Sequence, residues 1–301
     1  MLPSDAAAMV HPNPAFSLRR VGAMVLRYWY LLRGSWPRFL ELAYWPTMQM
    51  ILWGYINQFM ASSSAWVAQG AGVLVSAVLL WDVLFRGQLG VSVSFLEEMW
   101  SRNLGHLFVS PLRPGEWVAA LFGMSLIRTV IGVVPAALLA IPLFGYSLFD
   151  LGLPLAGFFA NLIVFGWSLG LVIVALILRY GMGAEGLAWI VVFMLAPVSA
   201  VYYPVSVLPG WLQWVALSLP SAHVFEGMRA ILFDGTMRWD HLAWAVGLNA
   251  LFMGLCTAAF LYSFHQARVR GALPAPCKSP APSIRRRPRG RRIWRSPWKR
   301  A

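Results

Sequence analysis

The residue types that do chemistry are few and widely spaced in this chain of 301 residues. The five histidines lie in separate segments, without the spacing of zinc or iron ligands: His11, His106, His223, His241 and His265. The aspartates are isolated too, so the sequence lacks the paired aspartates with which some membrane enzymes hold magnesium. A phosphate-binding loop GxxxxGK[ST] needs a lysine, and the two lysines, Lys278 and Lys299, lie near the C-terminus. The sequence therefore predicts no catalytic residue, no metal site, no cofactor bound by this chain and no ATP hydrolysis by it.

The composition indicates which kind of element positions the remaining polar residues. Hydrophobic residues make up 59% of the chain and charged residues 12%, about half the charged share of an average soluble protein. Apolar runs near the roughly 20 residues that cross a bilayer as a helix recur along the chain. The sequence predicts an all-α integral membrane protein.

The net charge of +13 is concentrated at one end. Residues 278–301 hold ten of the 24 basic residues and no acid, whereas the rest carries 14 basic and 11 acidic residues. Proline, serine and arginine dominate this tail, so we expect residues 273–301 to form a disordered cytoplasmic segment that fixes topology. Binding to anionic inner-leaflet lipids or RNA is the alternative. Because a nucleic-acid function would rest on the tail alone, we expect no specific nucleic-acid partner.

The segment SLRRVGAMVLRYWYLLR (17–33) has helical periodicity. Arg19, Arg20 and Arg27 share one face of such a helix, and apolar and aromatic residues fall opposite. This pattern is typical of a helix that lies in the membrane interface. Residues 1–36 are therefore predicted to be a cytoplasmic N-terminus with an amphipathic interfacial helix.

Six membrane spans are expected within residues 37–272, at about 40–60, 67–86, 117–144, 151–178, 186–203 and 241–264. Arginines cluster before the first span and after the last, while the link after the first span is uncharged and the link after the third has only Asp150. Since positive charge favours the cytoplasmic side, both termini are predicted to be cytoplasmic.

Residues 202–235, YYPVSVLPGWLQWVALSLPSAHVFEGMRAILFDG, are apolar but interrupted. Pro204, Pro209, Gly210 and Pro220 break the segment into pieces too short to cross a bilayer. A seventh span would put the basic tail outside. We therefore expect a re-entrant extracellular hairpin of two short helices.

The stretch FLEEMWSRNLGHLFVSPLRPGEW (95–117) places charges and prolines between two apolar runs. On a single helix, Phe95, Trp100, Leu104 and Leu107 lie on one arc, with Glu98 and Arg102 opposite. The two prolines, Pro111 and Pro114, end the pattern. The prediction is a short cytoplasmic helix parallel to the membrane, which could transmit a movement of a soluble partner to the membrane spans. An amphipathic loop resting on lipid is the alternative.

Each charged residue inside an apolar segment could have either a functional or a structural role. Arg128 could face a path for an anionic head group, or pair with Glu41 or Asp82, and we favour the pair. Glu226 and Arg229 are three residues apart on one helix face, so a pair that fixes the hairpin is favoured over a gate.

Aromatic residues gather in and after the fifth predicted span, and they too could have a functional or a structural role. Tyr202, Tyr203, Trp211 and Trp214 could line an exit path by stacking on a substrate. An interfacial aromatic belt is the commoner arrangement.

Several separated stretches together carry a resemblance: EEMWSRNLGHLFVSPLRPGEW, LRYGMGAEGLAW (178–189), YYPVSVLPGWLQ and LPSAHVFEGMRAIL. They resemble the permease subunit of type-2 ABC exporters over roughly residues 17–272. The resemblance implies a homodimeric pathway in the bacterial inner membrane, with a separate ATP-binding subunit that carries ATP and Mg. Membrane lipids and an amphiphilic, drug-like or glycan substrate are the other implied partners. An integral-membrane enzyme and an ATP-independent channel or assembly factor are the alternatives.

The family's coupling role falls here on residues 95–113. The implied contacts with the ATP-binding subunit come from both polar and apolar side chains: Phe95, Glu97, Glu98, Trp100, Arg102, Leu104, Leu107 and Arg113. A second group is expected at a gate or along the pathway: Arg128, Tyr202, Tyr203, Trp211, Glu226 and Arg229.

Overall fold

The computed structural model describes residues 16–63 and 73–269, and within these ranges the fold is all-α, as predicted, with no strand. Residues 1–15 and the basic tail fall outside the described part, so the predictions for them stay predictions. The α-helices are α1 (Leu18–Arg33), α2 (Trp36–Ser63), α4 (Val73–Trp100), α5 (Leu104–Val109), α6 (Pro114–Phe144), α7 (Leu153–Tyr180), α8 (Leu187–Val198), α9 (Gly210–Leu217), α10 (Pro220–Asp234) and α11 (Trp239–Val269). Three short 3₁₀ helices complete them: η1 (Leu148–Leu151), η2 (Gly181–Ala184) and η3 (Val205–Val207).

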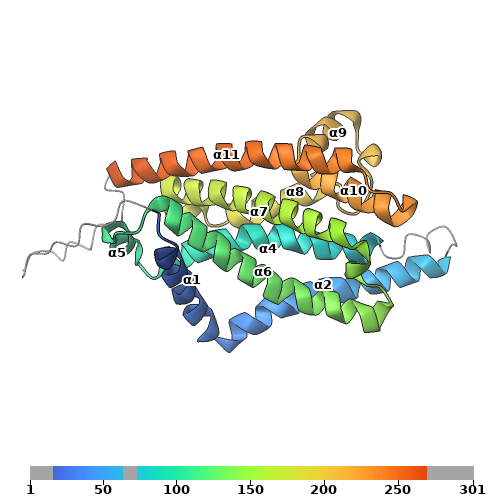
Figure 1. Cartoon of the computed structure of the whole chain (residues 1–301), viewed down its shortest axis with the longest axis horizontal. Coiled ribbons are helices and arrows are strands. Elements are labelled where there is room, and N and C mark those ends of the chain that lie inside the picture. Colours follow the sequence, from blue (N-terminus) through green and yellow to red (C-terminus); the bar gives the residue numbers. More distant parts are fainter. Residues whose placement is uncertain (1–15, 64–72, 270–301) are drawn as a thin grey trace, which may run out of the picture.

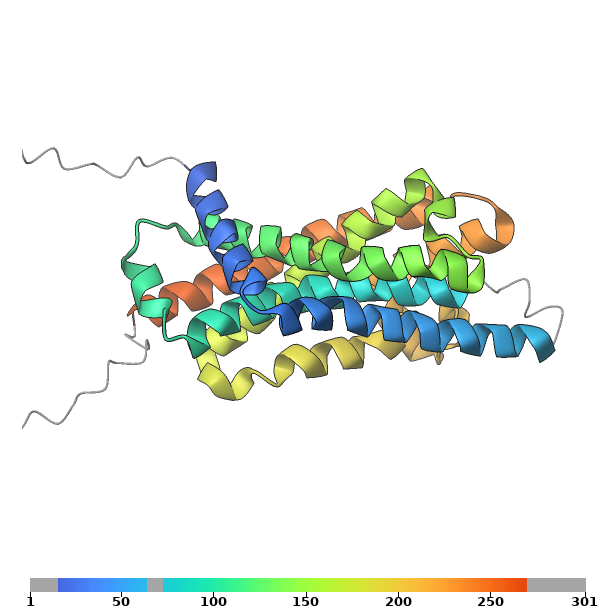
Figure 2. The same cartoon turned by 90° about the horizontal axis from the view of Figure 1, so that it is seen from below.

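The long helices run side by side along one axis (Figures 1 and 2). Helix α4 lies at the centre, packed mainly against α7 and α6, and most of its side chains are buried. Helices α1 and α5 lie at one end of the bundle, and α9 and α10 lie at the other (Figure 1). The two described ends of the chain, the start of α1 and the end of α11, share the end that holds α5 (Figures 1 and 2).

Four helical segments are long and apolar enough to cross a membrane: Val73–Trp100, Pro114–Phe144, Leu153–Ala184 and Trp239–Ala267. Helix α2 has the length, but Arg38, Glu41 and several amide side chains make it less apolar. Helix α8 has 12 residues, which span about 18 Å of a hydrocarbon core about 30 Å thick. The chain is thus a multi-pass membrane protein, and the spans predicted over α2 and α8 stay predictions.

Glycines bring α4 and α7 close together. A Cβ atom at Gly166 would lie 2.6 Å from the Leu84 carbonyl oxygen, and one at Gly170 would lie 2.7 Å from Cβ of Val91. Small residues at such crossings let helix backbones approach closely, and the resulting van der Waals packing is one of the interactions that drive helices together in lipid. This contact holds α4 in the middle of the bundle.

Residues 95–110 do not form the single helix that the sequence predicted. Helix α4 continues through Phe95 to Trp100, well beyond the predicted end of the second span at residue 86. The chain then turns at Arg102, whose φ is +54°, and α5 begins at Leu104. The prediction was wrong because nothing between residues 87 and 100 breaks a helix, whereas the turn after Trp100 carries neither glycine nor proline to mark it.

Candidate functional site

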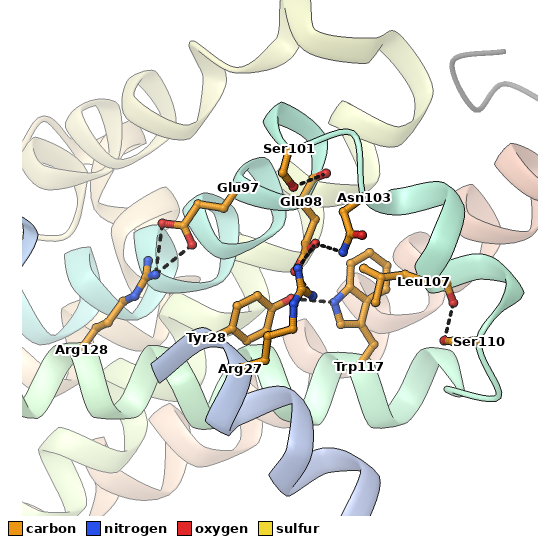
Figure 3. Close-up of polar contacts among 10 residues, drawn as sticks. All are labelled: Arg27, Tyr28, Glu97, Glu98, Ser101, Asn103, Leu107, Ser110, Trp117 and Arg128. Carbon is orange, nitrogen blue, oxygen red and sulfur yellow. Dashed lines mark hydrogen bonds and ion pairs between the residues drawn. The ribbon is translucent and has the colours of Figure 1, made fainter. Parts of the chain in front are cut away.

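The end of α4 carries a buried carboxylate that is fully engaged within the chain (Figure 3). Glu98 is 1% exposed, and its two oxygens accept hydrogen bonds from Arg27 of α1 at 2.6 and 3.0 Å. Asn103, in the turn before α5, donates a third hydrogen bond to Glu98 at 2.8 Å. The Glu98 carboxylate thus joins α1 to the α4–α5 turn, and its predicted contact with a partner protein stays a prediction.

The neighbouring acid makes a second junction (Figure 3). Glu97 accepts hydrogen bonds from Arg38 of α2 at 3.1 Å and from Arg128 of α6 at 3.0 Å. Arg128 is paired, as favoured from the sequence, but the partners predicted for it were wrong. Asp82 instead accepts from Arg86, one turn further along α4, at 2.6 Å.

Helix α1 is also tied to the start of α6. Arg20 donates to Glu116 through Nε at 2.8 Å, and the Ser17 backbone N–H donates to the same carboxylate at 2.8 Å. The Trp117 indole N–H donates to the Tyr28 hydroxyl at 3.0 Å. Burial, and after it the negative charge of Glu98, raises the pKa of Tyr28. Helix α1 therefore lies against the protein through the face that carries Tyr28, with two of its arginines reaching buried acids.

The predicted coupling residues divide into buried and exposed sets. Phe95 and Leu104 are buried among apolar residues of α1, α6, α7 and α11, and Leu107 packs against the same cluster. Trp100, Arg102 and Arg113 are exposed. Most of the predicted apolar arc thus faces the interior, whereas Trp100 is exposed with the turn between α4 and α5 and the segment that leads into α6.

A pocket of about 90 Å³ lies beside this surface. It is bounded by α5, the segment before α6 and the end of α11, and it is lined by Leu107, Ser110, Leu112, Arg113, Pro114, Trp117 and Phe264. The described residues contain no group of three or more histidines, cysteines or acids placed to hold a metal ion.

The predicted gate residues do not gather around Arg128. Glu226 and Arg229 form the expected pair at 3.2 Å, and Arg229 also donates to the carbonyl oxygens of Ala200 and Val201. The Glu226 carboxylate accepts from the Val205 backbone N–H at 2.7 Å. This pair therefore pins the irregular segment after α8 onto α10.

The aromatic residues near that segment play separate parts. Tyr202 stacks on Trp53 of α2, with ring centroids 4.5 Å apart, and Tyr203 donates to the Pro197 carbonyl oxygen at 2.6 Å. Trp211 is 71% exposed on α9. The two short helices predicted from the prolines are present as α9 and α10, and their depth in a membrane stays a prediction.

Two polar contacts were not predicted from the sequence: those of Glu116 and the pair of Asp82 with Arg86. Glu116 is fully buried, and its carboxylate accepts from the Arg113 backbone N–H as well as from α1. The signal was its position three residues after Arg113 at a helix start, where a glutamate commonly caps the helix. The pairing of Asp82 with Arg86 could have been found from their i, i+4 spacing.

A family model described as ABC-2 type transporter matches residues 23–233. The chain belongs to the ABC-2 type transporter family. The match runs from within α1 to the end of α10, so it covers the junctions at Glu97 and Glu98 and the paired helices α9 and α10. No curated protein matches the chain.

Membership confirms the resemblance and makes the chain a transporter permease, the membrane component of an ABC-2 transporter. Permeases of this family are not catalytic themselves and generally work with an ATP-binding subunit.

Proposed function

We propose that this chain is the permease of an ATP-driven exporter in the bacterial inner membrane, and that it works as a homodimer with a separate ATP-binding subunit. It crosses the membrane six times, with both termini in the cytoplasm and α9 and α10 forming a re-entrant extracellular hairpin. ATP and Mg bind the partner subunit, and the cargo is an amphiphilic, drug-like or glycan molecule.

The junction at the end of α4 is the observation that carries this proposal. Two consecutive acids, Glu97 and Glu98, bind arginines from three other helices: α1, α2 and α6. Helix α4 is also the most buried long helix of the bundle. A displacement of the exposed turn at Trp100 and Arg102 is therefore passed to four helices at once. A permease needs such a connection when a separate subunit hydrolyses the ATP that drives it.

The placement of the chain ends supports this orientation. The start of α1 and the end of α11 lie at the α5 end of the bundle (Figure 1), and the arginine-rich segments adjoin them. By the positive-inside rule this end is cytoplasmic. The exposed turn is then on the side where ATP and a soluble ATP-binding subunit are found.

Purification under mild conditions tests the proposal. The full chain, isolated from its own cells in a mild detergent, is expected to bring with it an ABC ATP-binding subunit, identified by mass spectrometry. The complex should hydrolyse ATP and the separated chain should not, because the chain has no phosphate-loop lysine. ATP hydrolysis by the separated chain would favour an enzyme, and ion conductance without ATP would favour a channel.

Matched variants connect this activity to the exposed turn. Replacing Trp100 and Arg102 together by alanine should lower recovery of the subunit and ATP turnover, with membrane abundance unchanged. Trp239→Ala, at an exposed tryptophan at the start of α11, is the control and should leave both at the wild-type level. Equal recovery and turnover in all three proteins would remove the turn from the coupling path.

A further inference from the structure

Two histidines meet at the end of the bundle opposite α5. His223 lies in the first turns of α10 and His241 at the start of α11, and their Nδ1 atoms are 3.1 Å apart. His223 is 7% exposed and packs beside the Trp244 ring, whereas His241 is partly exposed. Neither residue takes part in the junction at the end of α4.

The proton positions on this pair follow from a third contact. The Nε2 atom of His223 lies 2.9 Å from the Leu217 carbonyl oxygen. A carbonyl oxygen only accepts, so this nitrogen carries the proton and the Nδ1 atom of neutral His223 has a free lone pair. His241 therefore donates its Nδ1–H to His223.

This geometry matches one edge of a transition-metal site. Two imidazole nitrogens bound to one zinc ion at about 2.0–2.1 Å each, with a tetrahedral angle between them, lie about 3.3 Å apart. The observed 3.1 Å is within a few tenths of an ångström of that separation. The hydrogen bond from His223 to a backbone carbonyl is also typical, since a metal-bound histidine usually donates its other N–H to a carbonyl or carboxylate.

The charges near the pair do not oppose a cation. Arg238 and Asp240, which flank His241 on its N-terminal side, pair with each other at 2.8 Å, and Glu226 of α10 pairs with Arg229 at 3.2 Å. Each of these two ion pairs has no net charge, so the nearby charges neither repel nor strongly attract a cation and the two imidazoles are its ligands. Imidazole nitrogens suit zinc, copper and nickel better than calcium or magnesium.

We propose that His223 and His241 bind one divalent transition-metal ion, with zinc as the representative ion, through their two Nδ1 atoms. The ion takes the place of the proton between the rings, and that proton moves to Nε2 of His241, so both histidines stay neutral. Water fills the remaining positions, which is consistent with the partial exposure of His241. The bound ion joins the starts of α10 and α11.

Zinc binding by the full-length protein tests this site. The protein is purified in detergent, its affinity tag is removed, and it is dialysed against buffered low-micromolar free zinc before the bound metal is measured by mass spectrometry. The wild type is expected to retain about one zinc ion per chain. His223→Gln and His241→Gln should each need more than about tenfold more free zinc, because even loss of a second-shell partner costs about 10–100-fold.

A matched control and a second readout separate binding from folding. His265→Gln changes an exposed histidine far along α11 and should bind zinc as the wild type does. Zinc should raise the thermal unfolding temperature of the wild type and of this control, but not that of either site variant. Because His241 is more exposed than His223, His241→Gln should disturb folding less than His223→Gln. The proposal is overturned if the wild type retains no zinc, or if both site variants retain as much zinc as the control.

Discussion

Arg27 and Glu98 are 71 residues apart in sequence and form an ion pair 2.6 Å long between α1 and the end of α4. The pair is asymmetric, because the Glu98 side chain is 1% exposed and the Arg27 side chain is 36% exposed. The loss in the free energy of unfolding should therefore differ between removal of Arg27 and removal of Glu98. Without Arg27, the carboxylate stays buried and loses both guanidinium hydrogen bonds, while Asn103 still donates to it.

Arg27→Ala should thus destabilise the protein more than Glu98→Gln. Removal of one partner from a buried pair costs about 3–5 kcal/mol, and the exposure of Arg27 lowers our expectation to about 2–3 kcal/mol for Arg27→Ala. Glu98→Gln should cost about half as much, since the freed guanidinium can reach water. Thermal unfolding in detergent measures both, and the double variant should be more stable than Arg27→Ala alone. Equal losses for the two single variants would contradict the asymmetry of this ion pair.

Glu97→Gln should destabilise the protein through Arg128 rather than through Arg38. The Arg128 side chain is 8% exposed within α6, whereas that of Arg38 is 48% exposed. A charged side chain left unpaired at membrane depth costs about 2.5–3.5 kcal/mol by insertion scales. Arg128→Met should restore membrane abundance and unfolding temperature when combined with Glu97→Gln, and Arg38→Ala alone should have a small effect. No recovery in the combined variant would assign the loss to another contact of Glu97.

Gly166→Leu should separate α7 from α4. A Cβ atom there meets the backbone of α4, which cannot rotate away as a side chain can. Overpacking typically lowers the free energy of unfolding by about 1–3 kcal/mol, and we expect a loss near the upper end of that range. Gly254→Ala in α11 is the control, because no atom lies within 4 Å of its added Cβ. Abundance in the membrane and resistance to thermal aggregation report the difference. A Gly166→Leu protein as stable as the Gly254→Ala protein would contradict the close packing described for these two helices.

Local patterns in the sequence predicted the elements better than their contacts. The spacing of the arginines revealed α1, and Pro209, Gly210 and Pro220 marked where α9 and α10 begin. The turn at Arg102 was missed because its positive φ falls on a residue that seldom adopts one. Asn103 was the available signal, since asparagine is favoured just before a helix.

The candidate site could be placed on residues 95–113 but not resolved into its contacts. Glu97 binds arginines 59 and 31 residues away, and no periodicity in the sequence connects them. The partner of Arg128 was assigned to Asp82 or Glu41 because those acids also fall in apolar segments. Asp82 was already satisfied by Arg86 on its own helix, a local preference that outweighs a distant one.

Site-specific crosslinking tests most directly whether the α4–α5 turn receives the ATP-binding subunit. A photoreactive benzoylphenylalanine replaces Arg102 in one protein and Trp211, an exposed position on α9, in a second. After illumination of intact cells, the adducts are identified by mass spectrometry. We predict an adduct with an ABC ATP-binding subunit from position 102 and none from position 211. An adduct with that subunit from position 211, with none from position 102, would contradict the coupling role of the turn and the cytoplasmic placement of this end of the bundle.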